Sequence, residues 1–175
     1  MENGEKEIRE LRRLLRDLVA LATTPAGWVG RDREQIVESA ADVLLHTLRA
    51  DAVYVCLQSP KTIEVVRGPL YPRFSDEVRR LWPHPATAGL HIDTVTRSAW
   101  PNALRVAMQP IGISGDEGFI VVGCASSGFP NEAQSLLLSV AANQAAVALQ
   151  GARLRMQAEL ERHRIRTFLR RRPLP

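Results

Sequence analysis

The stretch Phe129–Leu154, FPNEAQSLLLSVAANQAAVALQGARL, predicts one long helix. Asn131 is a suitable N-cap residue, and Gln134 stands three residues later, where the partner of a capping box belongs. Apolar side chains then recur at helical spacing, with alanines between them. A helix with one apolar stripe covers a core. Because small residues occupy more than one face of this helix, we expect one side to pack on a sheet and another to meet a partner helix.

The segments around this helix predict an antiparallel sheet flanked by helices. Residues 5–22 form a helix with a heptad-like apolar seam, and Asp32, with Gln35 as its box partner, caps a second helix that ends near Leu48. Trp28 and Val29, in the loop between these helices, are expected to tuck under the second one. Strands are predicted at 52–58, 61–67, 91–96, 103–113 and 119–125, and a short helix capped by Ser75 at 74–82.

The order of these elements favours an α+β fold over a Rossmann arrangement, because strands do not alternate with crossover helices. Pro110 suggests that the 103–113 strand lies at an edge or contains a bulge. The strand at 119–125 is almost continuously apolar and is therefore predicted to be central. The final helix should continue to about Leu169 and stop before Pro173.

Composition limits the classes of protein that need be considered. The 175 residues suit one domain with helical extensions, and 45% of them are hydrophobic. The net charge of +4 is concentrated in arginines near the two ends, whereas residues 31–150 are close to balanced. The two cysteines stand inside apolar runs, which indicates buried thiols in a reducing, cytoplasmic compartment. We expect no signal peptide and no membrane span, because no apolar run of about 18 residues occurs.

The segment 118–154, GFIVVGCASSGFPNEAQSLLLSVAANQAAVALQGARL, resembles the C-terminal end of a GAF domain, with Gln144-Ala145-Ala146 and Ala152-Arg153-Leu154 at the places where that family has them. The segment 9–57 resembles the N-terminal input segments of bacterial sensor histidine kinases that begin with a GAF domain. The resemblance implies a GAF-like antiparallel sheet of about five to six strands. It divides the chain into a dimerisation helix and linker (1–30), a GAF domain (31–154) and a helical connector with a basic tail (155–175).

The resemblance also implies a small-molecule pocket between the sheet and the irregular segment 82–101. Its lining would come from Trp82, His84, His91 and Trp100, and its floor from Tyr54, Cys56, Met108 and Phe119. The alternative is that the tryptophans simply fill the core between loop and sheet. The ligand, if one binds, is not identified by the sequence.

We expect no cofactor. Neither cysteine stands where related photoreceptors attach a bilin, and the Asn-Lys…Phe…Asp-Glu signature of cyclic-nucleotide-binding members is absent. Haem would need His84 or His91 as its axial ligand. The spacing of His84, His91 and Asp93 matches no metal-binding pattern.

We also expect no catalytic activity in this chain. It contains no GxSxG, HExxH, P-loop or GxGxxG motif. A GAF-type reductase of free methionine sulfoxide would need several loop cysteines, because the reacting thiolate must be exposed. The sequence shows no phospho-acceptor segment and no ATP-binding glycine boxes, and His163 is interpreted as a surface histidine.

The predicted function is therefore that of a sensory or regulatory GAF module that passes a signal through its terminal helices. The terminal helices of two copies would form a four-helix bundle, and a downstream kinase or a PAS or GAF domain would belong to the full-length protein. The residues predicted to form the dimer interface are Leu11, Leu15, Leu18, Val140, Gln144, Val147 and Leu154. The alternative function is a GAF-type regulatory domain of a nucleic-acid-binding transcription regulator, which would use the Arg-rich tail after Arg162.

Overall fold

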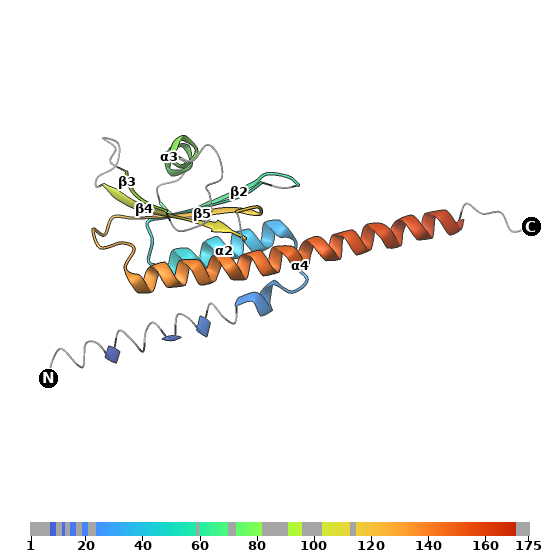
Figure 1. Ribbon diagram of the computed structural model, residues 1–175, viewed down its shortest axis with the longest axis horizontal. Coiled ribbons are helices and arrows are strands. Elements are labelled where there is room, and N and C mark those ends of the chain that lie inside the picture. Colours follow the sequence, from blue (N-terminus) through green and yellow to red (C-terminus); the bar gives the residue numbers. More distant parts are fainter. Residues whose placement is uncertain are drawn as a thin grey trace, which may run out of the picture.

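An open sheet of five antiparallel strands forms the middle layer of the molecule, in the order β2-β1-β5-β4-β3 (Figure 1). The computed structural model describes residues 8–9, 12, 15–16, 19–20, 24–58, 60–69, 73–81, 91–95, 103–112 and 115–170, and the described residues before 21 are helical. The remaining elements are η1 (Thr24–Trp28), α2 (Arg33–Thr47), β1 (Ala52–Leu57), β2 (Ile63–Arg67), α3 (Arg73–Leu81), β3 (His91–Val95), β4 (Leu104–Ile111), β5 (Gly118–Cys124) and α4 (Glu132–Arg170). This architecture confirms the predicted α+β class with an antiparallel sheet of five strands, and β5 is the central strand as expected.

Helices cover both faces of the sheet, so side chains that point to either face of a strand can be buried. All six residues of β1 are buried. Because side chains alternate along a strand, Val53, Val55 and Leu57 join the larger core beneath α2 and α4. Tyr54 and Cys56 join a second core beneath α3. Figure 1 shows α3 on one side of the sheet and the α2–α4 pair on the other.

Both predicted capping boxes are confirmed. The amide of Gln35 donates to Asp32 Oδ1 over 2.9 Å, and the amide of Asp32 donates to Gln35 Oε1 over 3.3 Å. At the start of α4 the corresponding distances between Asn131 and Gln134 are 2.8 and 3.0 Å. These reciprocal bonds satisfy amide donors that have no partner inside the helix, which explains why the first residues of both helices could be predicted.

Helix α4 is a core helix in its first part and an exposed extension, which we call the stalk, from Arg153 to its end at Arg170. Leu138, Ala142 and Leu149 are fully buried, whereas every residue from Arg153 to Thr167 is exposed. The helix therefore continues well past the sheet (Figure 1). By length and composition α4 could also cross a membrane, but 39% of its most apolar stretch is buried inside the domain, and core helices of folded domains share this length and composition.

Three local predictions were wrong. The helix α3 begins at Arg73, so Ser75 lies within the helix and is 3% exposed instead of capping it. The neighbouring Phe74 is buried in the core beneath α3. Val29 is exposed, whereas Trp28, the last residue of η1, is buried in the larger core.

The third error concerns β4, which is an interior strand and not an edge. It pairs with β5 on one side and β3 on the other. The register of β3 ends with His91 opposite Met108, so Pro110 lies beyond the last paired residue of β3. The missing N–H of proline therefore costs no ladder hydrogen bond on that side.

Candidate functional site

The four residues predicted as the floor of a pocket lie together on the α3 side of the sheet. Tyr54 and Cys56 come from β1, Met108 from β4 and Phe119 from β5, and all four belong to one buried cluster. The strand register places Cys56 opposite Phe119 and places Tyr54 and Met108 on either side of Val121. The rings of Tyr54 and Phe119 are 5.9 Å apart and tilted by 37°. This face of the sheet is thus apolar with a few polar groups, as small-molecule sites generally are.

Helix α3 covers this face through Phe74 and Val78, which are each 1% exposed. The contact depends on Gly123, because a Cβ atom there would stand 2.8 Å from Cε2 of Phe74. The described floor residues are therefore in contact with a helix. A ligand that reached them would have to move α3 or bind beside it.

A polar network ties α3 to the edge strand β2. Arg79 on α3 forms an ion pair with Glu64 on β2, and its Nε atom donates to Glu64 Oε1 over 3.3 Å. This hydrogen bond is the main reason why the pKa of Glu64 is lowered. Burial raises the pKa of Tyr54 well above its ordinary value, and the neighbouring Cys56 and Glu64 add to the effect. The phenol is therefore neutral at physiological pH.

The same burial raises the pKa of the Cys56 thiol. A thiol must ionise to act as a nucleophile, so the raised pKa makes Cys56 a poor nucleophile. Cys124 is also buried and unbridged. Among the described residues, no group of three or more His, Cys, Asp or Glu side chains could hold a metal ion.

Glu77 is a buried carboxylate on α3 that the sequence reasoning missed. It is 1% exposed, and Arg80 Nε donates to its Oε1 atom over 2.9 Å. The signal was present in the sequence, because Phe74, Glu77, Val78 and Leu81 follow helical spacing and so share one face. Buried charges of this kind are rare in proteins. Glu77 is therefore a further candidate for a functional residue on this side of the sheet.

The predicted lining of the pocket is only partly placed. His91 lies on the edge strand β3, is exposed, and is in register with Met108. Trp82, His84 and Trp100 lie outside the described residues. The pocket between sheet and middle segment thus stays a prediction.

The residues predicted to form a dimer interface on α4 are largely accessible. Val147 is 67% exposed and Leu154 is 60% exposed, while Val140 and Gln144 are half-buried. On the N-terminal helix, Leu15 is 60% exposed, and Leu11 and Leu18 lie outside the described residues. Exposed branched side chains along one helix face are unusual for a face that contacts only water.

Two arginines tie the base of the stalk to the domain. Arg153 lies 3.9 Å from Glu117, which in turn lies 3.5 Å from Arg33 at the start of α2. Burial lowers the pKa of Arg33, and the charge of Glu117 opposes this shift. Arg155 donates to the Arg31 carbonyl over 3.2 Å. Beside these contacts α4 borders a groove of about 700 Å³ whose lining includes Gly112, Asp116, Asn143, Val147, Gln150 and Leu154.

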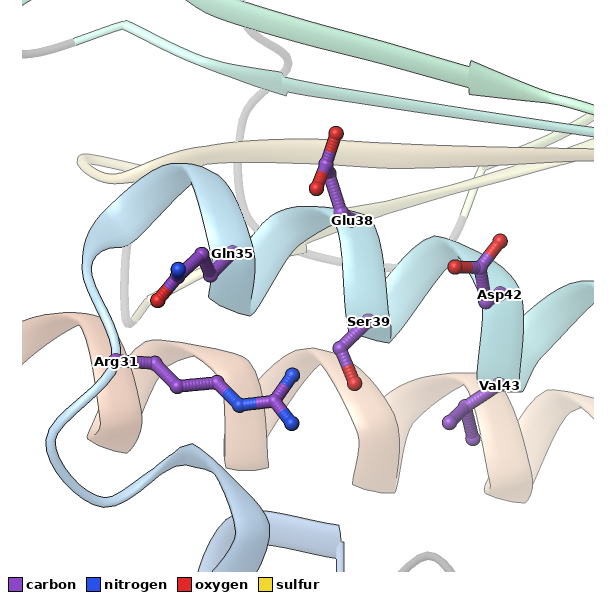
Figure 2. Close-up of a pocket in the computed structure, with 6 residues that line it drawn as sticks. All are labelled: Arg31, Gln35, Glu38, Ser39, Asp42 and Val43. Atoms are coloured by element: carbon purple, nitrogen blue, oxygen red, sulfur yellow. The ribbon is translucent and has the colours of Figure 1, made fainter.

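A second hollow of about 530 Å³ follows the outer side of α2. Its lining residues are Arg31, Gln35, Glu38, Ser39, Asp42 and Val43 (Figure 2). Glu38 and Asp42 also form ion pairs with Arg67 of β2: Nη2 of Arg67 lies 3.6 Å from Glu38 Oε1, and its Nε lies 2.8 Å from Asp42 Oδ1. Since its lining is mainly polar and carries both signs of charge, this hollow does not have the apolar character typical of a small-molecule site.

Comparisons with known proteins find similarity in structure but not in sequence. No protein-family model matches the chain, and no curated protein matches it. The GAF domain of a protein described as a sensor histidine kinase from Pseudomonas syringae pv. tomato superposes with a TM-score of 0.66 at 15% identity, over 91% of this chain and 99% of that one.

Two GAF domains of phosphoenolpyruvate-protein phosphotransferases are also similar. The domain from Coxiella burnetii has a TM-score of 0.56 at 13% identity, over 83% of this chain and 98% of that one. The domain from Acinetobacter has a TM-score of 0.50 at 11% identity, over 83% of this chain and 95% of that one. Sheet order, the helices on both faces and these superpositions agree: the chain has the fold of GAF domains.

Proposed function

We propose that this chain is a non-catalytic sensory or regulatory module of a bacterial signal-transduction protein and that it acts as a homodimer. The observation that carries the proposal is the dual character of α4, which is buried at Leu138 and Leu149 and exposed from Arg153 onward. One continuous helix thus connects the core of the domain to a segment whose residues from Met156 to Thr167 are exposed within the described part of the chain. The similar GAF domain from Pseudomonas syringae belongs to a protein described as a sensor histidine kinase, which is consistent with a module that drives a downstream kinase or a further PAS or GAF domain.

In this proposal, a small molecule or partner acts on the α3 side of the sheet. Strand β1 passes the change through the sheet, since Tyr54 and Cys56 face α3 while Val53 and Val55 face α2 and α4. Close-packed cores transmit small displacements instead of absorbing them. The ligand does work only by binding one arrangement of the paired helices more tightly than another.

The dimer is tested by placing a charge on the exposed face of α4. Val147→Asp should dissociate the dimer, because an aspartate would then face its own copy in a dehydrated seam. Thr62→Asp is the matched control. Thr62 is exposed in the loop between β1 and β2, so this substitution introduces the same charge away from α4. Sedimentation equilibrium should give a monomer for Val147→Asp and a dimer for Thr62→Asp and the wild type. A dimer of unchanged affinity for both variants would refute this interface.

A regulatory domain that contacts nucleic acid is the second candidate, and the exposed arginines of the stalk favour it. Arg162, Arg164 and Arg166 are all exposed. Contacts with phosphate make binding strongly salt-dependent. Retention on duplex DNA that falls steeply with salt and vanishes when residues 162–175 are removed would support this function. Salt-independent retention, or none, would exclude it.

A further inference from the structure

The exposed apolar face of α4 repeats every 11 residues. Leu136, Val147 and Ala158 are 11 apart, as are Val140 and Gly151 and, on the same face, Leu154 and Ile165. Leu136, Val147, Leu154 and Ile165 are between 48% and 67% exposed. We call Leu136, Val140, Val147, Leu154, Ala158 and Ile165 the outer stripe. Over 29 residue steps at about 1.5 Å each, the outer stripe is about 44 Å long.

A seven-residue repeat does not fit the structure at the start of this helix. A heptad seam through Val140, Gln144 and Val147 would need Leu137 in its first layer. Leu137 is 3% exposed because it lies in the core of its own domain, whereas its neighbour Leu136 is 48% exposed. The 11-residue repeat continues from Leu136 through Asn143 to Val147, and it leaves Gln144 on the flank.

We infer that the outer stripe pairs in parallel with the outer stripe of a second copy, along a straight seam that uses the 11-residue repeat. This inference rests on the proposed homodimer and specifies its packing. Helices with an 11-residue repeat stay straight or coil slightly to the right, in contrast to the left-handed heptad coil. Gly151 and Ala158 leave room for the two backbones to approach closely near the base of the stalk.

The charges beside the outer stripe favour a second copy as its partner. Glu161 borders one side of the stripe, and Arg162 and Arg166 border the other. Within the described part of the chain, Glu161 makes no ion pair. In a parallel pair, one flank of each helix faces the opposite flank of the other, so that Glu161 comes within reach of Arg162 or Arg166 of the second copy. The stripe therefore supplies both halves of the complementary charge.

The area of the outer stripe fits a dimer that also uses the N-terminal helix. A strip about 44 Å long and about 10 Å wide covers on the order of 440 Å², roughly half of the ~800 Å² per partner of a stable interface. Ile8, Leu15 and Val19 of the N-terminal helix are 51–62% exposed. They provide further apolar surface of the kind that the remaining half would need.

Neighbouring cysteines test the repeat directly. Asn143→Cys, Gln144→Cys and Val147→Cys would each be introduced singly and treated with a short bifunctional thiol crosslinker, and the wild type would control for Cys56 and Cys124, which are both buried. We expect dimer crosslinks at 147 and at 143 and at least a fivefold lower yield at 144. Leu136→Cys should behave like Asn143→Cys.

The outcomes separate this inference from the dimer itself. Crosslinking at 147 and 144 but not at 143 would show a heptad seam, which would overturn the inference and leave the homodimer standing. No crosslinks at any position, together with a monomer in sedimentation, would refute the proposed homodimer. Equal yields at 143 and 144 would show a mobile or differently oriented interface and would also overturn the inference.

Discussion

Gly123 is the residue that lets α3 lie flat on the sheet. A Cβ atom at this position would stand 2.8 Å from Cε2 and 3.0 Å from Cζ of Phe74; the first distance is too short for a real contact and the second is unusually tight. Phe74 and Val78 of α3 belong to the buried cluster on this face of the sheet. The size of one side chain in β5 thus controls how closely the helix covers the candidate ligand-binding side.

We therefore predict that Gly123→Ala lowers the free energy of unfolding by about 1–3 kcal/mol, the usual cost of overpacking a core. Gly128→Ala is the control, because a Cβ atom there would have no neighbour within 4 Å. Urea denaturation followed by circular dichroism measures both changes. If the two variants were equally stable, α3 would not pack on β5 as described.

Glu64 makes the free energy of unfolding depend modestly on pH in the acidic range. Its pKa is lowered in the folded chain, first by the hydrogen bond from Arg79, below the ordinary value of 4.5. A group with a lowered folded pKa contributes stability above its unfolded pKa, and that contribution is lost as the pH falls through the folded pKa. The Arg79 and Glu64 side chains are 51% and 30% exposed, so the effect should be small, about 0.5 kcal/mol.

Glu64→Gln should therefore lose less stability than the wild type between roughly pH 5 and pH 3. Glu159→Gln serves as the control, since Glu159 is an exposed stalk residue for which the described structure shows no ion pair. Urea midpoints across this pH range measure the difference. A wild-type acid profile that Glu64→Gln leaves unchanged would show that the contact with Arg79 is not formed in solution.

At the scale of elements, the joint between α2, β5 and α4 depends on Glu117. The side chains of Arg33 and Glu117 are 12% and 13% exposed and lie 3.5 Å apart, while Arg153 is 55% exposed and lies 3.9 Å from Glu117. Nη2 of Arg33 is buried and has no hydrogen-bond partner among the described residues. Glu117 therefore provides the charge that offsets the burial of Arg33.

Removing Glu117 should cost far more than removing Arg153. We predict that Glu117→Gln lowers the free energy of unfolding by about 1–3 kcal/mol, because it leaves a largely buried guanidinium without an opposing charge. Arg153→Gln should change it by less than about 0.5 kcal/mol. Chemical denaturation of both variants tests this ranking. The reverse order would mean that Arg153 is the main partner of Glu117.

Local sequence signals predicted the elements well where a backbone group needed a specific partner. Asn131 with Gln134, and Asp32 with Gln35, fixed the starts of α4 and α2, because a capping box is a local arrangement. Ser75 was wrongly predicted as a cap because its residue type suits that position, whereas the packing of α3 on the sheet places Ser75 inside the helix. The position of Pro110 was also set by tertiary structure: its strand β4 lies inside the sheet, but the pairing with β3 stops at Met108, before Pro110.

The candidate site was predictable only in part, for a similar reason. The resemblance to GAF domains implied the four floor residues. In the structure, alternation along β1 places Tyr54 and Cys56 on one face, and the strand order brings Met108 and Phe119 to them. Glu77 was overlooked because an acidic residue in a short, highly charged helix is ordinarily exposed. The Arg33–Glu117–Arg153 contacts join residues far apart in the sequence, and no spacing rule connects them.

In the whole molecule, the proposed signalling depends on two copies lying side by side with their stalks pointing the same way. Among the described residues, the stalk is exposed from Met156 to Thr167, although Met156 and Leu160 continue the core-facing side of α4 and Ile165 continues its outer stripe. Most of the stability of a helix in a protein comes from packing its apolar face against a partner. The second copy would provide the missing contacts and would set the spacing of whatever follows.

The most direct measurement is the distance between spin labels on the two stalks of the full chain. Double electron–electron resonance on His163→Cys would report it, because His163 is exposed and lies away from the outer stripe. Parallel pairing at the usual interaxial distance predicts about 25 Å between labels. An antiparallel pair centred on Val147 would separate them by about 50 Å, and a monomer would show no dipolar modulation; either result would contradict the parallel dimer.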